Sequence, residues 1–81
     1  MIQQWQFQHI LIQSEVGAAS GVATAANQVN GVVFVDAITG PYDVLVKVEA
    51  ETMDDLGKKV VSDIQKIGGI TRTLTCPVVH I

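Results

Sequence analysis

The sequence predicts an α+β domain with the element order βαββαβ. Two observations carry this prediction. Four stretches rich in β-branched and aromatic residues are separated by two stretches whose apolar residues recur at spacings of three and four. Gly40-Pro41 stands between two of the β-rich stretches, and such a turn signal predicts a hairpin. With 81 residues, the chain is expected to form a single domain over residues 1–81.

The composition predicts a globular domain that self-associates. The chain is 48% hydrophobic and 16% charged, which is too apolar for a disordered segment. A domain of this size buries only about 60–65% of the surface that its unfolded chain exposes. We therefore expect a second copy to cover part of the remaining apolar surface.

Several functional classes are disfavoured by the charge and the cysteine count. The net charge is −3 and the five basic residues form no cluster, so nucleic-acid binding by the chain itself is not expected. No apolar run is long enough to cross a membrane, and Met1–Gln4 lacks the pattern of a signal peptide. Cys76 is the only cysteine, which excludes an internal disulfide and offers no metal cluster. These features fit a cytoplasmic protein without a cofactor.

The first strand is predicted over Trp5–Gln13. Glutamines alternate with aromatic residues at its start, and the apolar run Ile10–Ile12 follows. The strand is therefore expected to bury one face at its start and both faces further along. His9 is interpreted as a half-buried histidine, because a metal role needs partners and only His80 is available.

The first helix is predicted over Val16–Val29, with Asn30-Gly31 as its stop signal. Gly17 and Gly21 weaken this helix, but the segment lacks the lysine and the spacing of a phosphate-binding loop. Its expected apolar face consists of small residues that allow close packing on a sheet: Ala18, Val22, Ala25, Ala26 and Val29.

The second helix is predicted over Thr52–Ile67. Thr52 and Asp55 fit the capping pattern in which the hydroxyl accepts a free N–H at the helix start. Asp54–Lys58 and Asp55–Lys59 are expected to pair on the solvated side. The apolar stripe is expected at Met53, Leu56, Val60, Ile64 and Ile67.

The hairpin strands are predicted over residues 32–38 and 44–50, and the last strand over residues 70–76. Alternation places the hydroxyls of Thr71, Thr73 and Thr75 on one face, and Pro77 predicts an edge position for this strand. The apolar tail 78–81 is expected to pack on a neighbouring subunit or to fold back onto the sheet.

These elements predict a ferredoxin-like sandwich. Right-handed crossovers put both helices on one face of a sheet with the strand order 4-1-3-2. The other face carries Leu45 and either Leu11 or Ile12, without a helix to cover them. Two such faces packed against each other would make a dimeric α/β barrel.

The sequence resembles the effector-binding (RAM) domain of the Lrp/AsnC, or feast/famine, transcriptional regulators. The resemblance is carried by Ile10–Ile12 leading into Glu15–Gly17, by Thr39–Asp43, and by Gly69–Thr75. Family regulators carry a helix-turn-helix domain before this one, whereas only four residues precede Trp5 here. The resemblance therefore implies the stand-alone type of member.

The resemblance implies binding of an amino acid or similar small effector where dimers meet. Carried onto this sequence, the site comprises Gly40, Tyr42, Asp43, Thr73 and Thr75. The Asp43 carboxylate suits the ammonium, and threonine hydroxyls with N–H groups near Gly40 suit the carboxylate. Arg72 is ranked below the threonines because it alternates away from them. The implied assembly is a homodimer that builds a higher oligomer such as an octameric ring, with full-length Lrp/AsnC regulators as further partners.

Two alternatives remain at this point. Dimeric α/β barrels also include small cofactor-independent oxygenases, for which His9, Trp5 and Tyr42 are the candidate residues. The chain can also be a structural assembly module that binds only protein. No arrangement of base and nucleophile is visible in the sequence, which favours a non-enzymatic role.

Overall fold

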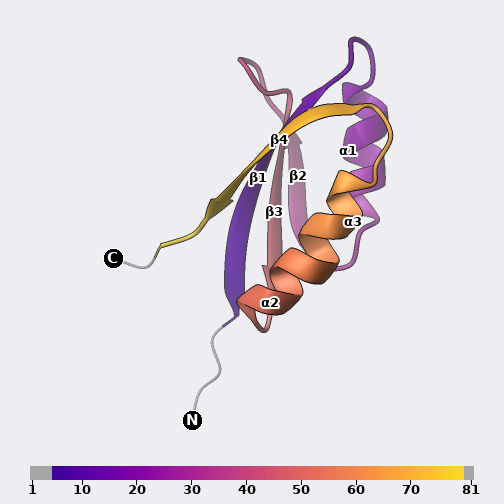
Figure 1. Cartoon of the computed structure of the whole chain (residues 1–81). Coiled ribbons are helices and arrows are strands. Elements are labelled where there is room, and N and C mark those ends of the chain that lie inside the picture. Colours follow the sequence, from indigo (N-terminus) through magenta and orange to yellow (C-terminus); the bar gives the residue numbers. More distant parts are fainter. Residues whose placement is uncertain (1–4, 80–81) are drawn as a thin grey trace.

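A computed structural model describes residues 5–79. It consists of a four-stranded antiparallel sheet with the helices on one face (Figure 1). The strands are β1 (Gln6–Ser14), β2 (Val32–Ala37), β3 (Val44–Ala50) and β4 (Ile70–Pro77). Helix α1 (Ala19–Asn27) connects β1 to β2, and the segments α2 (Met53–Asp55), η1 (Leu56–Val61) and α3 (Ser62–Gln65) connect β3 to β4.

The strand order is β2-β3-β1-β4, which confirms the predicted order 4-1-3-2 and the ferredoxin-like fold. β1 lies between β3 and β4, with Ile10 opposite Val46 on one side and Thr75 on the other. β2 and β4 are therefore the two edge strands, and the edge position expected for β4 from Pro77 is confirmed.

The core lies between the sheet and the helices. Alternate residues of β1 and β3 point to this covered face, and Ile10, Ile12 and Val46 have no exposed surface. Gly31 closes the turn before β2 with φ 97°, and a Cβ there would lie 2.6 Å from Cγ2 of Val60. The buried hydrophobic residues are Ile10, Ile12, Val22, Ala26, Val44, Val46, Val48, Ala50, Leu56, Val60 and Ile64.

Helix α1 is shorter at both ends than the predicted Val16–Val29. Gly17 has φ 83°, and the Ala18 N–H donates to the Glu15 carbonyl at 2.9 Å, so this segment forms a turn that precedes the helix. At the other end the Gln28 N–H donates to the Ala25 carbonyl, which tightens the last turn. Val22 and Ala26 are buried as expected.

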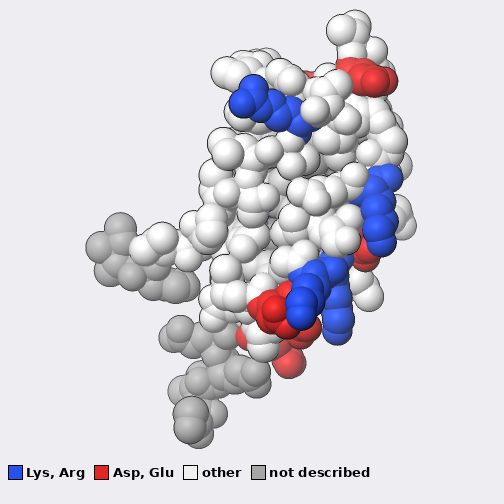
Figure 2. Space-filling view, in the orientation of Figure 1, with Lys and Arg blue, Asp and Glu red and all other residues white. Residues whose placement is uncertain are grey.

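The second helical region runs from Met53 to Gln65 and has a π-helical middle, η1. Thr52 caps it as predicted, with its Oγ1 accepting the Asp55 N–H at 3.0 Å. Both predicted ion pairs form, at 3.2 Å for Lys58–Asp54 and 3.6 Å for Lys59–Asp55. Figure 2 shows acidic and basic side chains adjacent over this region. Within the expected stripe, Met53 is 47% exposed while Leu56, Val60 and Ile64 are buried.

The opposite face of the sheet has no helix over it (Figure 1). Leu11 stands directly between Leu45 and Leu74, which makes a row of three leucines across β3, β1 and β4. Leu74 is 45% exposed. The register thus assigns Leu11 to this open face and buries Ile12 on the covered one. The expected uncovered apolar face is present in the single chain.

No helix among residues 5–79 is both long and apolar enough to cross a membrane. The Val78 N–H donates to the Phe7 carbonyl at 3.1 Å, so the tail begins by extending the contact between β4 and β1. His80 and Ile81, the rest of the predicted packing tail, lie outside the described residues.

Candidate functional site

The loop between β2 and β3 folds back onto the end of β1. The Ile38 N–H donates to the Asp43 carbonyl at 2.8 Å, and the Asp43 N–H donates to the Ile12 carbonyl at 2.9 Å. Gly40 has φ 124°, a backbone conformation that favours glycine, and is exposed at the loop tip. Tyr42 is half-buried. The loop residues expected at the site therefore lie together at one end of the sheet, called here the loop end.

Asp43 binds the last residue of β1. Its Oδ2 accepts the Ser14 N–H at 2.9 Å and, through a short hydrogen bond, the Ser14 hydroxyl. Both hydrogen bonds from Ser14 favour the charged form of the carboxyl and therefore hold the pKa of Asp43 below its usual 3.8. The bond from the hydroxyl has the larger effect, and the bond from the N–H has the smaller one. Asp43 is therefore a structural cap as well as a candidate ligand-binding group.

The second carboxylate oxygen of Asp43 is available to a ligand. Both side-chain bonds use Oδ2, and within residues 5–79 Oδ1 has no hydrogen bond. The residue is half-buried, so Oδ1 can accept from an ammonium group without first breaking the contact to Ser14.

Gln13 joins the loop to β4. Its Nε2 donates to the Pro41 carbonyl at 3.2 Å. The Thr71 hydroxyl lies 3.1 Å from both the Oε1 and the backbone carbonyl of Gln13. The end of β1 thus contacts the hairpin loop on one side and the start of β4 on the other.

A β-bulge at the start of β4 separates the three threonines. Gln13 pairs with Arg72 and Ser14 pairs with Ile70, so Thr71 is the extra residue. Thr71 therefore turns to Gln13 and does not share a face with Thr73 and Thr75. The prediction that all three hydroxyls point from one face is wrong for Thr71, because the bulge interrupts the alternation.

Thr73 and Thr75 lie away from Asp43 within the chain. They pair with Ile12 and Ile10, whose side chains point to the helices, and they are half-buried on that face. β1 lies between them and Asp43. Arg72 instead pairs with Gln13 and is exposed, so Asp43 and Arg72 belong to segments on opposite sides of the end of β1.

Sequence reasoning missed Gln13 and Ser14. Their partners are 28, 29 and 58 residues away in sequence, so no local pattern indicates these contacts. The available signal was the change from the apolar run Ile10–Ile12 to two polar residues at the strand end.

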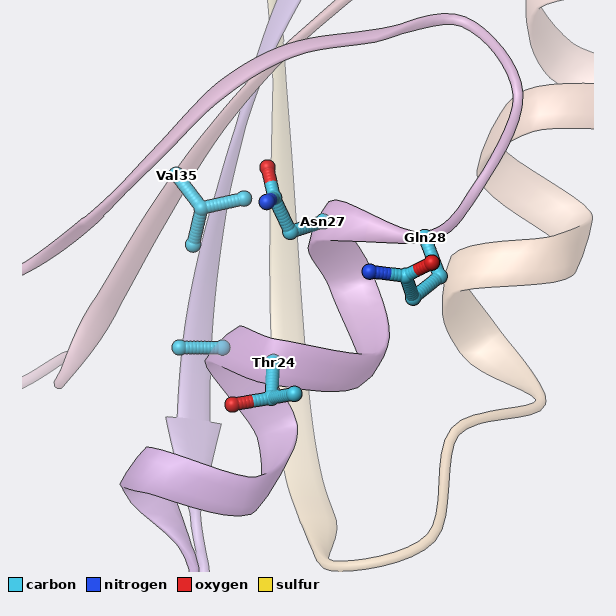
Figure 3. A pocket seen from close by; sticks show the side chains of 5 residues that line it. Thr24, Asn27, Gln28 and Val35 are labelled. Carbon is cyan, nitrogen blue, oxygen red and sulfur yellow. The ribbon is translucent and has the colours of Figure 1, made fainter.

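A groove of about 280 Å³ lies between α1 and the edge strand β2 (Figure 3). Asn27 and Thr24 project into it from α1, with Val35 on the sheet side. It is lined by Ala23, Thr24, Asn27, Gln28 and Val35, none of which is ionisable. The groove is thus less suited to a charged ligand than the loop end.

His9 and Cys76 face each other across β1 and β4 on the open face, and Lys47 is the neighbour of His9 on β3. Among residues 5–79 no group of three histidine, cysteine or acidic side chains has an arrangement that would hold a metal ion. Lys47 Nζ lies 4.9 Å from the centre of the Phe7 ring, so this cation stacks on an aromatic face.

Comparison with known protein families identifies the family to which the chain belongs. The model of the Lrp/AsnC ligand binding domain matches residues 9–81. The chain belongs to this family. No curated protein matches its sequence at a significant level. Lrp/AsnC ligand-binding domains are regulatory and bind small effectors, which agrees with the expectation drawn from Thr39–Asp43 and Gly69–Thr75.

Solved structures agree with the family assignment. FFRP-DM1 has a TM-score of 0.84 and 27% identity, and the match covers 91% of this chain and 99% of that one. AsnC of E. coli has a TM-score of 0.83 and 22% identity, with 94% and 52% covered. A transcriptional regulator of Neisseria meningitidis, solved as a complex with L-Met, has a TM-score of 0.78 and 17% identity, with 93% and 50% covered. Because AsnC of E. coli and the Neisseria meningitidis regulator share only 22% and 17% of their residues with this chain, these two matches support the fold alone.

Proposed function

We propose that this chain is an amino-acid sensor domain of the Lrp/AsnC type, which binds its effector at the loop end of the sheet. The observation that carries the proposal is the free Oδ1 of Asp43 on a carboxylate that Ser14 already holds in place and in its charged form. A fixed anion at an exposed loop suits the ammonium of an α-amino acid.

The groups for the effector carboxylate come from the loop and from β4. Backbone N–H groups near Gly40 and the exposed guanidinium of Arg72 are donors at the loop end. Thr73 and Thr75 remain part of the proposed site. Because β1 separates them from Asp43 in one chain, we place Gly40, Tyr42 and Asp43 of one dimer opposite the threonines of another. A site at the contact between dimers accommodates that separation.

The proposed homodimer forms through the open face. Its row of Leu11, Leu45 and Leu74 is apolar and is covered by no helix among residues 5–79, and a second copy would remove it from water. Dimers then assemble into a higher oligomer such as an octameric ring. A ligand that binds between dimers favours the assembled state, so effector binding and assembly are coupled.

Regulation is the proposed outcome of this coupling. The chain is proposed to act in the cytoplasm, by itself or in mixed assemblies with full-length Lrp/AsnC regulators, and to leave DNA binding to those partners. The chemical class of the effector is supported by the L-Met held by the Neisseria meningitidis regulator of the same fold. An enzymatic role is not proposed, because the dimer contact proposed for the open face would cover His9 together with its neighbours Lys47 and Cys76.

A thermal-shift screen of the wild-type protein against the twenty amino acids tests this proposal. An amino acid present at about 100 times its Kd should raise the free energy of unfolding by about 2.7 kcal/mol. Asp43→Asn should abolish the shift, because a neutral amide cannot pair with the ammonium. Asp54→Asn, on the solvated side of the second helical region, is the matched control and should retain it.

Two results would contradict the sensor proposal. The first is a wild-type protein whose melting temperature none of the twenty amino acids changes. The second is an Asp43→Ala protein that loses its oligomeric state while no ligand affects the wild type, which would favour the structural assembly module.

A further inference from the structure

One side-chain amide spans the loop end. Gln13 lies near the end of the central strand β1, and both polar groups of its amide are used: Nε2 by the Pro41 carbonyl at 3.2 Å, and Oε1 by the Thr71 hydroxyl at 3.1 Å. An amide is the side chain that combines a donor and an acceptor in one rigid plane. The position of the loop is thereby linked to that of the β4 bulge.

The loop tip has little else to hold it. Within the described residues, the backbone bonds of Asp43 to Ile12 and Ile38 fix the base of the loop. For residues 39–42, the bond from Gln13 to the Pro41 carbonyl is the contact to β1. Gly40 has no atom within 4 Å of the position that a Cβ would take, so packing does not confine this residue, whereas Tyr42 is half-buried. Without Gln13, the tip at Gly40 and Pro41 loses its hydrogen bond to β1.

The other side of the link is equally specific. The Thr71 hydroxyl meets both the backbone carbonyl and the side-chain Oε1 of Gln13, and Thr71 is in reach because the bulge makes it the extra residue of β4. Arg72 is the next residue and pairs with Gln13 across the two strands. The Gln13 amide thus connects the loop to the residue that directly precedes Arg72.

We propose that Gln13 is the positioning residue of the effector site, which couples the loop wall at Gly40–Asp43 to the β4 wall at Thr71–Arg72. This inference rests on the proposed function, and it adds a residue that itself need not touch the effector. A pre-organised site loses less conformational entropy on binding, so the link raises affinity without new contacts to the ligand. It also means that a change of position that the effector causes in one wall is transmitted to the other wall.

Gln13→Glu tests the link with almost no change of shape. At pH 7 the carboxylate still accepts from Thr71 but cannot donate to the Pro41 carbonyl, so the loop side alone is released. Thr71→Val releases the β4 side alone. Gln65→Glu, an exposed glutamine at the end of α3, introduces the same charge away from the site and is the matched control.

The first measurement is made without ligand. Backbone ¹⁵N–¹H heteronuclear NOE values at Gly40 and Tyr42 should fall in Gln13→Glu and stay unchanged in Gln65→Glu, while the melting temperatures of both variants remain close to that of the wild type. Unchanged NOE values at the loop in Gln13→Glu would overturn the link, whatever the protein binds.

The second measurement is affinity for the amino acid that shifts the wild-type melting temperature most. Gln13→Glu and Thr71→Val should each weaken binding about tenfold, the scale of one hydrogen bond, with Gln65→Glu unaffected. Wild-type affinity in Gln13→Glu would overturn the positioning role while leaving the proposed function intact. Absence of binding by the wild type would overturn the proposed function, and the effector role of Gln13 with it.

Discussion

The two faces of the sheet are built from the same strands but differ in what covers them. On the covered face Ile10, Ile12 and Val46 lie under the helices with no exposed surface. On the open face Leu11 and Leu45 are half-buried and Leu74 is 45% exposed. The covered face is completed by the chain itself, whereas the open face is the one on which we propose that a second copy packs. The difference separates residues that stabilise the fold from residues that would stabilise the proposed assembly.

Neighbouring residues of β1 offer the sharpest test of that separation. Ile10→Ala should lower the free energy of unfolding by about 2–5 kcal/mol at every protein concentration, because it leaves a cavity under the helices. Leu11→Ala should cost much less at low protein concentration, where the open face is uncovered. Chemical denaturation at two protein concentrations measures both. Equal, concentration-independent losses would show that the two faces do not differ in this way.

Leu74→Lys should break the assembly and leave the fold intact. A lysine ammonium within a face-to-face contact loses its hydration, so the variant should be monomeric with a wild-type circular dichroism spectrum. Val16→Lys is the control, since Val16 is fully exposed in the turn before α1. Size-exclusion chromatography with light scattering gives the mass of each. A Leu74→Lys protein with the wild-type mass would place the subunit contact elsewhere.

The smallest expected effect concerns the cap at the loop end. Because the pKa of Asp43 is lowered in the folded protein, its contribution to stability is present above the unfolded value, near 3.8, and is lost as the pH falls through the folded value. The stability difference between wild type and Asp43→Asn should therefore be constant near neutral pH and shrink below pH 3.8. Urea denaturation between pH 7 and pH 2.5 measures it. A difference that grows towards low pH would contradict the assigned direction of the pKa.

The fold was predictable because the spacing of apolar residues differs between strands and helices and can be read from the sequence. Val44, Val46 and Val48 alternate along β3 and are all buried, and Leu56, Val60 and Ile64 recur every four residues and are buried together. The ends of α1 were not predictable in the same way. Gly17 and Ala18 continue the small-residue pattern of the helix, yet the positive φ of Gly17 puts both before its start.

The alternation of polar and apolar residues also gave a wrong impression of burial at the start of β1. Gln8 belongs to the alternating glutamines, which read as one polar side of a strand, but only 6% of it is exposed because it shares the covered face with Ile10. Its Oε1 has no hydrogen bond within the described residues. Which side of a strand is covered depends on where the helices pack, and that is a property of the whole fold.

The candidate site was predictable only in its local part. Gly40, Tyr42 and Asp43 are adjacent in sequence and come together in one loop. Gln13, Ser14 and Thr71 reach that loop through strand pairing and through a bulge whose position depends on the register of β1 and β4. Strand register is decided by contacts between distant segments, so a single sequence does not reveal which polar residues meet.

Sedimentation velocity of the wild-type protein, with and without the amino acid that raises its melting temperature most, tests the central claim most directly. If the open face forms the dimer and the loop end holds the effector between dimers, the protein sediments as a dimer or larger, and the ligand shifts the distribution towards the larger species. A protein that sediments as a monomer, or an assembly whose distribution no amino acid changes, would contradict the account.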